Sequence, residues 1–317
     1  MKTALAILLL ALPLYASAQA WPTKPVKVLV PFPPGGVTDA VARITADWLT
    51  QRLGQSVVAE NRPGASGAIA AELVARAEPD GYTLLSAAAP QLAVVPYVQK
   101  INYDPVKDFA PISIVGANSF VLGCNEKVPA RTLKELIDYA KARPGQLNYA
   151  SPGQGSVGHL SMALLLARAD VKMEAVLYKG GGPAVADMVA GHVPCYFGNL
   201  NELLPHVSSG RVRLLATSGT QREAALPNVP TVAEQGYPGF RTATWNGYVA
   251  PAATPREVVE RIAREIAAAC KDAAFAARLE KIGVDPVCGT PAQFAQAIRE
   301  DLQIWKEAVQ AAGIKPQ

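Results

Sequence analysis

The sequence has few of the side chains that most often build catalytic, metal and nucleic-acid sites. It holds only 3 histidines and 4 cysteines, and 18% of its 317 residues are charged. The histidines are scattered, and neither C-x-x-C nor H-E-x-x-H spacing occurs, so we expect no metal site and no cofactor. The formal net charge is +4 at pH 7, and no run of Lys and Arg is interleaved with aromatic residues. We therefore expect no nucleic-acid surface.

Long apolar runs are also lacking, except at the N-terminus. Lys2 precedes the run ALAILLLALPL, and Ala16-Ser17-Ala18 supplies small residues where a signal peptidase cleaves. The run is too short to span a membrane. We predict a cleavable signal peptide over residues 1–18, with cleavage after residue 18 or 20, the alternative being an uncleaved anchor. The remaining chain is then exported and soluble.

Strand and helix patterns alternate along the rest of the chain, which is long enough for two lobes. Short β-rich runs occupy residues 26–32, 55–61 and 81–89. Helix starts are marked by capping-box patterns such as Thr132 with Glu135 and Thr290 with Gln293. This alternation predicts an α/β fold in which each lobe is a mostly parallel sheet flanked by helices.

Two segments are suited to cross between the lobes. Residues 110–126 are long for one strand, and residues 241–255 would return. We therefore assign residues 21–121 and 243–317 to lobe 1 and residues 122–242 to lobe 2. The two crossing strands would form a hinge, in which a few residues absorb domain closure.

The four cysteines raise the question of disulfides, because the chain is expected to be exported. Four cysteines allow three pairings. The pairing of Cys124 with Cys195 and of Cys270 with Cys288 keeps each bridge within one lobe. The alternative is that all four are buried free thiols.

The stretch YASPGQGSVGHLS, residues 149–161, admits three interpretations. Its glycines match the G-x-G-x-x-G dinucleotide fingerprint, but Pro152 sits in the turn and no acidic residue ends the following strand. Ser156 and His159 could serve a hydrolase, although the G-x-S-x-G elbow lacks its first glycine and Ser156 suits a helix N-cap. Thirdly, a glycine loop that opens a helix binds anions through its N–H groups. PFPPGGVTD, residues 31–39, is a second such loop in the other lobe, so lobe closure would present both loops to one small anion.

Several motifs together resemble one family. VPFPPGGVTDAVAR, ENRPGASG, NYASPGQGSVGHL, YKGGGPAVADMVAGHV and PNVPTVAEQG occur in this order along nearly the whole mature chain. They are similar to the Bug-type receptors of tripartite tricarboxylate transporters. The resemblance implies a periplasmic solute-binding protein of the two-lobed type II kind, a monomer and not an enzyme. Such receptors trap a small carboxylate between the lobes and deliver it to the membrane permease subunits of the transporter.

The resemblance also implies which residues bind the carboxylate, largely through main-chain amides, hydroxyls and ordered water. One loop runs from Phe32 to Gly36 and the facing loop runs from Ser151 to Ser156, with further wall positions elsewhere. The full set of expected ligand-binding residues is Phe32, Pro34, Gly35, Gly36, Asp39, Ala65, Ser66, Ala88, Gln91, Ser151, Gly153, Gly155, Ser156, His159, Asn199 and Trp245.

Departures from the family pattern bear on the ligand. PFPPGG has prolines where the family often has alanines, which stiffens the loop and removes a donor at each position. Asn199 stands where many relatives carry an aspartate, and a neutral amide suits a dicarboxylate or an uncharged group. Phe32 and Trp245 would favour an aromatic acid, unless they pack in the core. Di- or tricarboxylates and aromatic acids therefore both stay open.

Two other functions remain as alternatives to solute binding. One is a secreted serine hydrolase that uses Ser156 and His159. The other is a ligand-sensing receptor domain that signals to a sensor kinase.

Overall fold

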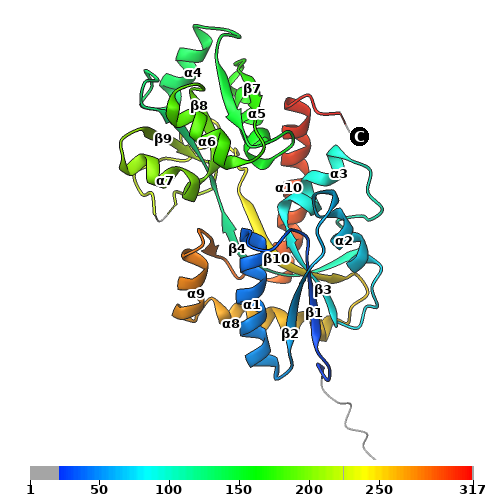
Figure 1. Cartoon of the computed structure of the whole chain (residues 1–317). Coiled ribbons are helices and arrows are strands. Elements are labelled where there is room, and N and C mark those ends of the chain that lie inside the picture. The colour runs from blue at the N-terminus through cyan, green and yellow to red at the C-terminus, as the bar shows by residue number, and fades with distance from the viewer. Residues whose placement is uncertain (1–20, 224, 316–317) are drawn as a thin grey trace, which may run out of the picture.

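The computed structural model describes residues 21–223 and 225–315. The predicted signal peptide, residues 1–18 with cleavage after residue 18 or 20, lies outside the described residues. Two separate β-sheets form the centres of two lobes, one above the other in Figure 1. The two-lobed α/β fold expected from the sequence is confirmed. Within the described ranges, no helix is both long enough and apolar enough to cross a membrane.

Lobe 1 contains a six-stranded sheet with the order β11-β4-β10-β3-β1-β2. Adjacent residues of one strand point to opposite faces of this sheet, so Val28 packs with α1, α8 and α9, whereas Leu29 packs with α2 and α10. Both faces are thus covered by helices. The elements are β1 (Val26–Val30), α1 (Val37–Leu53), β2 (Val57–Asn61), α2 (Ala68–Ala75), β3 (Thr83–Ala88), α3 (Val95–Val98), β4 (Phe109–Asn118), β10 (Thr244–Pro251), α8 (Arg256–Ala269), α9 (Ala273–Glu280), β11 (Asp285–Pro286) and α10 (Pro291–Ala311).

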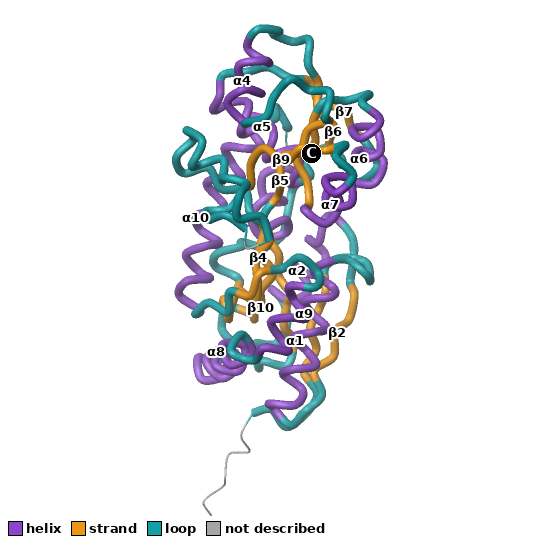
Figure 2. Tube along the Cα trace, turned by 90° about the vertical axis from the view of Figure 1, so that its left-hand side faces the viewer, coloured by secondary structure: helices purple, strands orange, loops and turns teal. Residues whose placement is uncertain are grey.

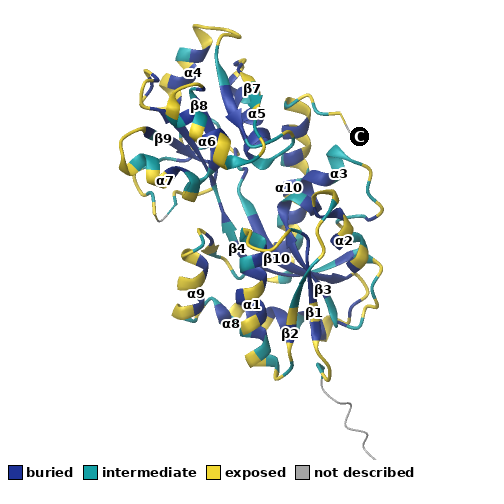
Figure 3. Cartoon of the chain, viewed as in Figure 1, coloured by how far each residue is buried: buried dark blue, intermediate teal, exposed yellow. Residues whose placement is uncertain are grey.

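Lobe 2 contains a five-stranded sheet with the order β7-β6-β8-β5-β9. Its core lies on both faces of this sheet, and Figure 3 shows buried strands beneath helices whose outer faces are exposed. The elements are β5 (Phe120–Asn125), α4 (Leu133–Lys141), β6 (Asn148–Ser151), α5 (Val157–Ala169), β7 (Glu174–Leu177), α6 (Gly181–Ala190), β8 (Cys195–Asn199), α7 (Leu200–Ser208) and β9 (Val212–Thr217).

Strand direction follows from how the chain passes between the lobes. β1, β2 and β3 are parallel to one another, as are β6, β7 and β8. β5 and β10 are antiparallel to their neighbours, because each enters its lobe from the other one. Most strands of each sheet therefore share one direction, as predicted, but the sheets are mixed because of these entering strands and β11.

The first crossing segment is one extended run that breaks at Ser119 into β4 and β5. The chain returns between β9 and β10. The two crossings are joined at Ser218, whose N–H donates to Phe120 O at 2.8 Å and whose Oγ accepts from Phe120 N at 2.9 Å. This junction places both crossings side by side, as a hinge requires.

Helix α10 forms a third connection between the lobes, which the sequence does not predict. Phe294 and Ile298, near its start, pack in the core of lobe 1. Trp305 and Ala308, further along, pack in the core of lobe 2. Figure 2 shows α10 running along one side of the molecule past both lobes. The C-terminal half of this helix therefore belongs by packing to lobe 2.

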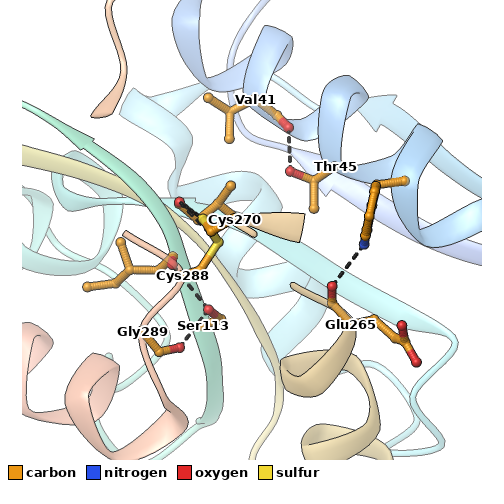
Figure 4. Close-up of a disulfide and its surroundings, with 10 residues drawn as sticks. Val41, Thr45, Ser113, Glu265, Cys270, Cys288 and Gly289 are labelled. Atoms are coloured by element: carbon orange, nitrogen blue, oxygen red, sulfur yellow. Dashed lines mark hydrogen bonds between the residues drawn. A yellow bond between two sulfur atoms is a disulfide. The ribbon is translucent and has the colours of Figure 1, made fainter. Parts of the chain in front are cut away.

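Both disulfides follow the expected pairing. Cys124 and Cys195 are direct partners on β5 and β8, and their sulfur atoms are bonded. The second disulfide joins Cys270, at the end of α8, to Cys288, just after β11 (Figure 4). Beside it, Ser113 Oγ of β4 donates to Gly289 O at 2.7 Å, so the segment after β11 is held to the sheet.

The two predicted capping residues begin their helices as expected. Thr132 Oγ1 accepts from Glu135 N at 3.1 Å at the start of α4. Thr290 Oγ1 accepts from Gln293 N at 3.3 Å at the start of α10, where the reciprocal bond completes a capping box. These local signals fix helix starts in both lobes.

Candidate functional site

The two lobes face each other with the carboxyl ends of their parallel strands. In lobe 1, β1 and β2 lead through loops into α1 and α2, and in lobe 2, β6, β7 and β8 lead into α5, α6 and α7. β4 and β9 run in the same directions as these strands and leave their lobes toward the hinge. The helix N-termini, with their free N–H groups and partial positive charge, therefore surround the space between the lobes.

A cavity of about 590 Å³ lies between the lobes. Five of the sixteen expected ligand-binding residues line it, namely Phe32, Ser66, Gly153, Gly155 and Ser156. Among the described residues that line it, Lys315 alone carries a charge. The remaining lining residues are Pro90, Val94, Val95, Val98, Gln99, Pro152, Gln154, Val157 and Ile314. An apolar wall with a few amides, hydroxyls and helix N–H groups suits a small organic anion.

Ser156 is the N-cap of α5 and does not act with His159 as a nucleophile with its base. Its Oγ accepts from His159 N at 3.3 Å and donates to Gly153 O at 2.8 Å. His159 Nδ1 accepts from Gly155 N at 3.0 Å. Burial lowers the pKa of His159, which keeps the ring neutral and able to accept this bond. Both side chains are therefore used to shape the loop.

The three glycines of the apparent dinucleotide fingerprint are needed for the turn and for the close packing of α5 that follows it. Gly153 and Gly155 have φ angles of 144° and 70°, which other residues rarely adopt. Gly158 has ordinary φ, but a Cβ there would lie 2.2 Å from Phe197 O of β8. The match to G-x-G-x-x-G arises because any tight strand–loop–helix turn of this kind has the same steric needs.

In lobe 1, Asp39 holds the loop before α1. Its carboxylate accepts from Gly35 N at 3.0 Å, from Asn61 Nδ2 at 2.8 Å and from Arg43 Nε at 3.1 Å. Burial alone would raise the pKa of Asp39, but these hydrogen bonds outweigh it, and the pKa lies below its ordinary value. Asp39 therefore positions Gly35 and has its charge balanced by Arg43. Pro34, Gly35 and Gly36 are exposed, but none of them lines the 590 Å³ cavity.

The loop before α2 has an uncommon backbone. Ala65 and Ser66 have φ angles of 46° and 54°, in the left-handed region that side chains with a Cβ rarely occupy. Ala65 O accepts from Gln99 Nε2 at 3.0 Å, which ties this loop to the segment after α3. Strained residues of this kind cluster at binding sites, and Ser66 is exposed and lines the cavity.

Other expected residues lie behind the cavity wall or beside it. Ala88, Gln91 and Ser151 are fully or almost fully buried, and Gln91 Nε2 donates to Ser86 O at 3.4 Å. Asn199 is the N-cap residue of α7 and lines a second cavity, of about 430 Å³, between the lobes. Its N–H donates to a Glu202 carboxylate oxygen at 3.2 Å.

Trp245 is placed in the core of lobe 1, under α10, and not in the wall of the 590 Å³ cavity. Its side chain meets the ring of Phe294 edge-on, with centroids 4.8 Å apart, and its Nε1 donates to Asp301 Oδ2 at 2.7 Å. The core-packing interpretation therefore describes this residue, which also borders a separate cavity of about 490 Å³ beside the lobe junction.

The sequence analysis does not identify Ile314 and Lys315 of the cavity wall, nor a third glycine loop, which does not line the 590 Å³ cavity. The loop Gly180–Gly182 opens α6 in the same way as the two assigned glycine loops, and the motif YKGGGPAV carries the signal that could have found it. Ile314 and Lys315 line the cavity because α10 ends beside it. No local sequence signal identifies them, since their position depends on the packing of α10 against lobe 2.

Comparison with known proteins agrees with this geometry. A family model described as tripartite tricarboxylate transporter family receptor matches residues 41–314. Protein BugT of Bordetella pertussis is 38% identical over 301 residues, which cover 94% of this chain and 92% of BugT. A solved R. palustris structure with adipate is 36% identical, with a TM-score of 0.77, covering 94% of this chain and all of that one. MatC from Rhodopseudomonas palustris with bound malate is 31% identical, with a TM-score of 0.72, covering 91% of this chain and all of MatC.

The match covers most of the chain and includes both lobes. Its relatives share the fold over almost their whole length, so the likeness does not rest on a single motif. Members of the matched family are receptors that bind a solute, and not enzymes. The chain belongs to the receptor family of the tripartite tricarboxylate transporters and is a periplasmic-type solute-binding protein.

Proposed function

We propose that this protein captures a small di- or tricarboxylate between its lobes and delivers it to the permease subunits of a tripartite tricarboxylate transporter. The observation that carries the proposal is the cavity between the lobes, where the glycine loop before α5 faces Phe32 and Ser66 of lobe 1. Relatives with 36% and 31% identity have been solved with adipate and malate, which are both dicarboxylates. Trp245 lies in the core, so an aromatic acid has less support.

Binding would depend on main-chain groups more than on charged side chains. The first N–H groups of α5 have no partner within the helix and carry partial positive charge, so a carboxylate at this helix start gains about 0.3–2 kcal/mol from the dipole alone. Phe32 would pack against the carbon chain of the ligand, and Ser66 would approach it from lobe 1. Contacts from both lobes would then stabilise the closed state.

We further propose the division of the chain into moving bodies. Residues 21–121 and 243–317 would form lobe 1 and residues 122–242 lobe 2, with the hinge at the Ser119 and Ser218 junction. As an exception to these bounds, the end of α10 would move with lobe 2, because Trp305 packs there. We also propose that the N-terminal segment directs export to the periplasm and that the protein works as a monomer.

The direct test is a thermal-shift screen of the mature protein with unbranched diacids from malonate to adipate, with malate and citrate, and with benzoate. A ligand at one hundred times its Kd should raise the free energy of unfolding by about 2.7 kcal/mol. Calorimetry should then give one site per chain. The proposal would be refuted if none of the aliphatic di- or tricarboxylates bound, or if benzoate bound more tightly than all of them.

The hydrolase alternative lacks support in the geometry. The Ser156 hydroxyl donates to Gly153 O, and Nδ1 of His159 accepts from Gly155 N. The wild-type protein should therefore show no turnover of ester substrates. The sensor alternative shares the binding step and would differ only in its partner, so co-purification with permease subunits separates it from transport.

A further inference from the structure

Helix α10 ends beside the ligand cavity in a defined C-terminal cap. Gly313 has a left-handed φ of 65°, and its N–H donates to Gln310 O at 3.0 Å. The next N–H, of Ile314, donates to Val309 O at 3.3 Å. This pair of bonds is the Schellman motif, which turns the chain sharply out of the helix. The direction in which Ile314 and Lys315 leave α10 is therefore fixed by Gly313.

The end of α10 is held firmly against lobe 2. Glu307 of α10 accepts from Arg168 of α5 at two positions, with Nε–Oε1 and Nη2–Oε2 distances of 3.0 and 2.9 Å. Ile314 packs against the core of lobe 2, and its Cδ1 lies 3.9 Å from where a Cβ of Gly155 would stand. The residue after Ile314 thus lies next to the glycine loop that opens α5.

Few charged groups lie near the ligand cavity. Lys315 is the one charged side chain among the described lining residues, and the residue before it, Ile314, approaches Gly155 of the loop of residues 152–157. The carboxylate of Asp39 in lobe 1 is balanced by Arg43 at 3.0 Å and is itself buried. A single carboxylate can be held by the start of α5, so the ammonium of Lys315 remains for a second anionic group.

We propose that Lys315 makes this site selective for dianions, by pairing with the second carboxylate of a ligand whose first carboxylate lies at the start of α5. This inference rests on the proposed carboxylate-binding function and adds the class of ligand to it. A monocarboxylate of the same length would keep the contact with α5 and gain nothing from Lys315. The charge difference between the two ligands, and not their length, would then set the preference.

The test compares Lys315→Gln with wild-type protein and with Lys306→Gln. Lys306 is an exposed lysine on α10 that does not line the cavity, so its loss matches the change in net charge. Calorimetry would measure the affinity of the tightest-binding diacid of the screen and of the monoacid with the same number of carbons. An ion pair that closes partly out of water should make Lys315→Gln weaken diacid binding by roughly 3- to 10-fold. Monoacid binding should change by less than about 2-fold, and Lys306→Gln should change neither.

A second variant keeps the lysine and disturbs its placement. Gly313→Ala puts a Cβ on a left-handed residue, which frees the end of the chain from its cap. It should lower diacid affinity as Lys315→Gln does, and 0.5 M NaCl, a concentration that screens exposed charges, should reduce both effects. Equal diacid affinity in wild type and Lys315→Gln would overturn the inference and leave the proposed function standing. Wild-type protein that bound monoacids as tightly as diacids would overturn it too, and failure to bind any di- or tricarboxylate would refute both.

Discussion

The close contact between α5 and β8 can be tested by adding one methyl group. Gly158→Ala would place a Cβ 2.2 Å from Phe197 O and 3.4 Å from Phe197 C, so no side chain can rotate away to make room. Non-bonded carbon contacts are favourable at about 3.5–4.0 Å. The start of α5 must therefore withdraw from β8 by roughly 1 Å, and the loop that includes Gly155 and Ser156 must move with it.

The expected cost follows from two opposing effects. Overpacking of this kind costs about 1–3 kcal/mol, whereas alanine is favoured over glycine in a helix by up to about 1 kcal/mol. We expect a net loss of about 1–2 kcal/mol in the free energy of unfolding. Displacing the N–H groups that are proposed to hold the ligand should also weaken diacid binding by about 10- to 100-fold, the equivalent of one hydrogen bond to a charged group.

Urea unfolding measures the loss of stability and calorimetry measures the loss of diacid affinity, with Gly182→Ala as the matched control. Gly182 lies in the first turn of α6, and a Cβ there would meet nothing within 4 Å. The control should be as stable as wild type or more stable by about 0.5–1 kcal/mol. A Gly158→Ala protein with wild-type stability and affinity would show that α5 does not depend on this contact, and would refute the reasoning.

Three further predictions follow from side chains described above or from the lobe junction. Ser156→Ala removes the N-cap of α5 and should lower the free energy of unfolding, measured in urea, by about 0.5–2 kcal/mol. Ser156→Thr keeps a capping hydroxyl and should lower it by less. Equal losses for the two variants would contradict the capping role. The Cys124–Cys195 bridge has a sequence separation of 71 and the Cys270–Cys288 bridge one of 18. In the chain-entropy relation, removing the first should destabilise the protein by about 4 kcal/mol and removing the second by about 3 kcal/mol. The reverse order would contradict that relation here. Burial, together with a hydrogen bond to Asp285 across the lobes, raises the pKa of Glu223 from its usual 4.5 to about 7. The folded state then keeps a proton that the unfolded state releases, so the free energy of unfolding should fall as pH rises from 4.5 to 7, by roughly 1–2 kcal/mol after allowing for solvent access. Glu223→Gln should flatten this slope, and an unchanged slope would assign it to other groups.

The parts of the fold that local chemistry determines could be predicted from the sequence. Thr132 and Thr290 start helices because their hydroxyls accept from N–H groups three residues on, whatever the rest of the chain does. The breaks at Gly153 and Gly155 follow from φ angles that the turn needs. The glycine loops that begin α1 and α5 could be predicted for the same reason.

The position of Trp245 could not be predicted in this way. Seven of the eight residues of β10 are buried, because helices cover both faces of the lobe 1 sheet. A strand of this kind shows no alternation of apolar and polar residues, so its sequence does not say which face a side chain occupies. The position of Lys315 could not be predicted from the sequence either, since it depends on the packing of α10 against α5, which is far away in sequence.

The passage of α10 into both cores also bears on how the chain folds. Trp305 is 1% exposed and sits in the core of lobe 2, although a long stretch of lobe 1 separates it from residues 122–242, the segment proposed for lobe 2. Losing a buried tryptophan costs about 3–5 kcal/mol, a large part of the 5–15 kcal/mol that typically holds a domain folded. Residues 122–242 produced alone should therefore be poorly folded. In the whole protein, lobe 2 completes its core only when the last helix docks, so the two lobes acquire their stability together.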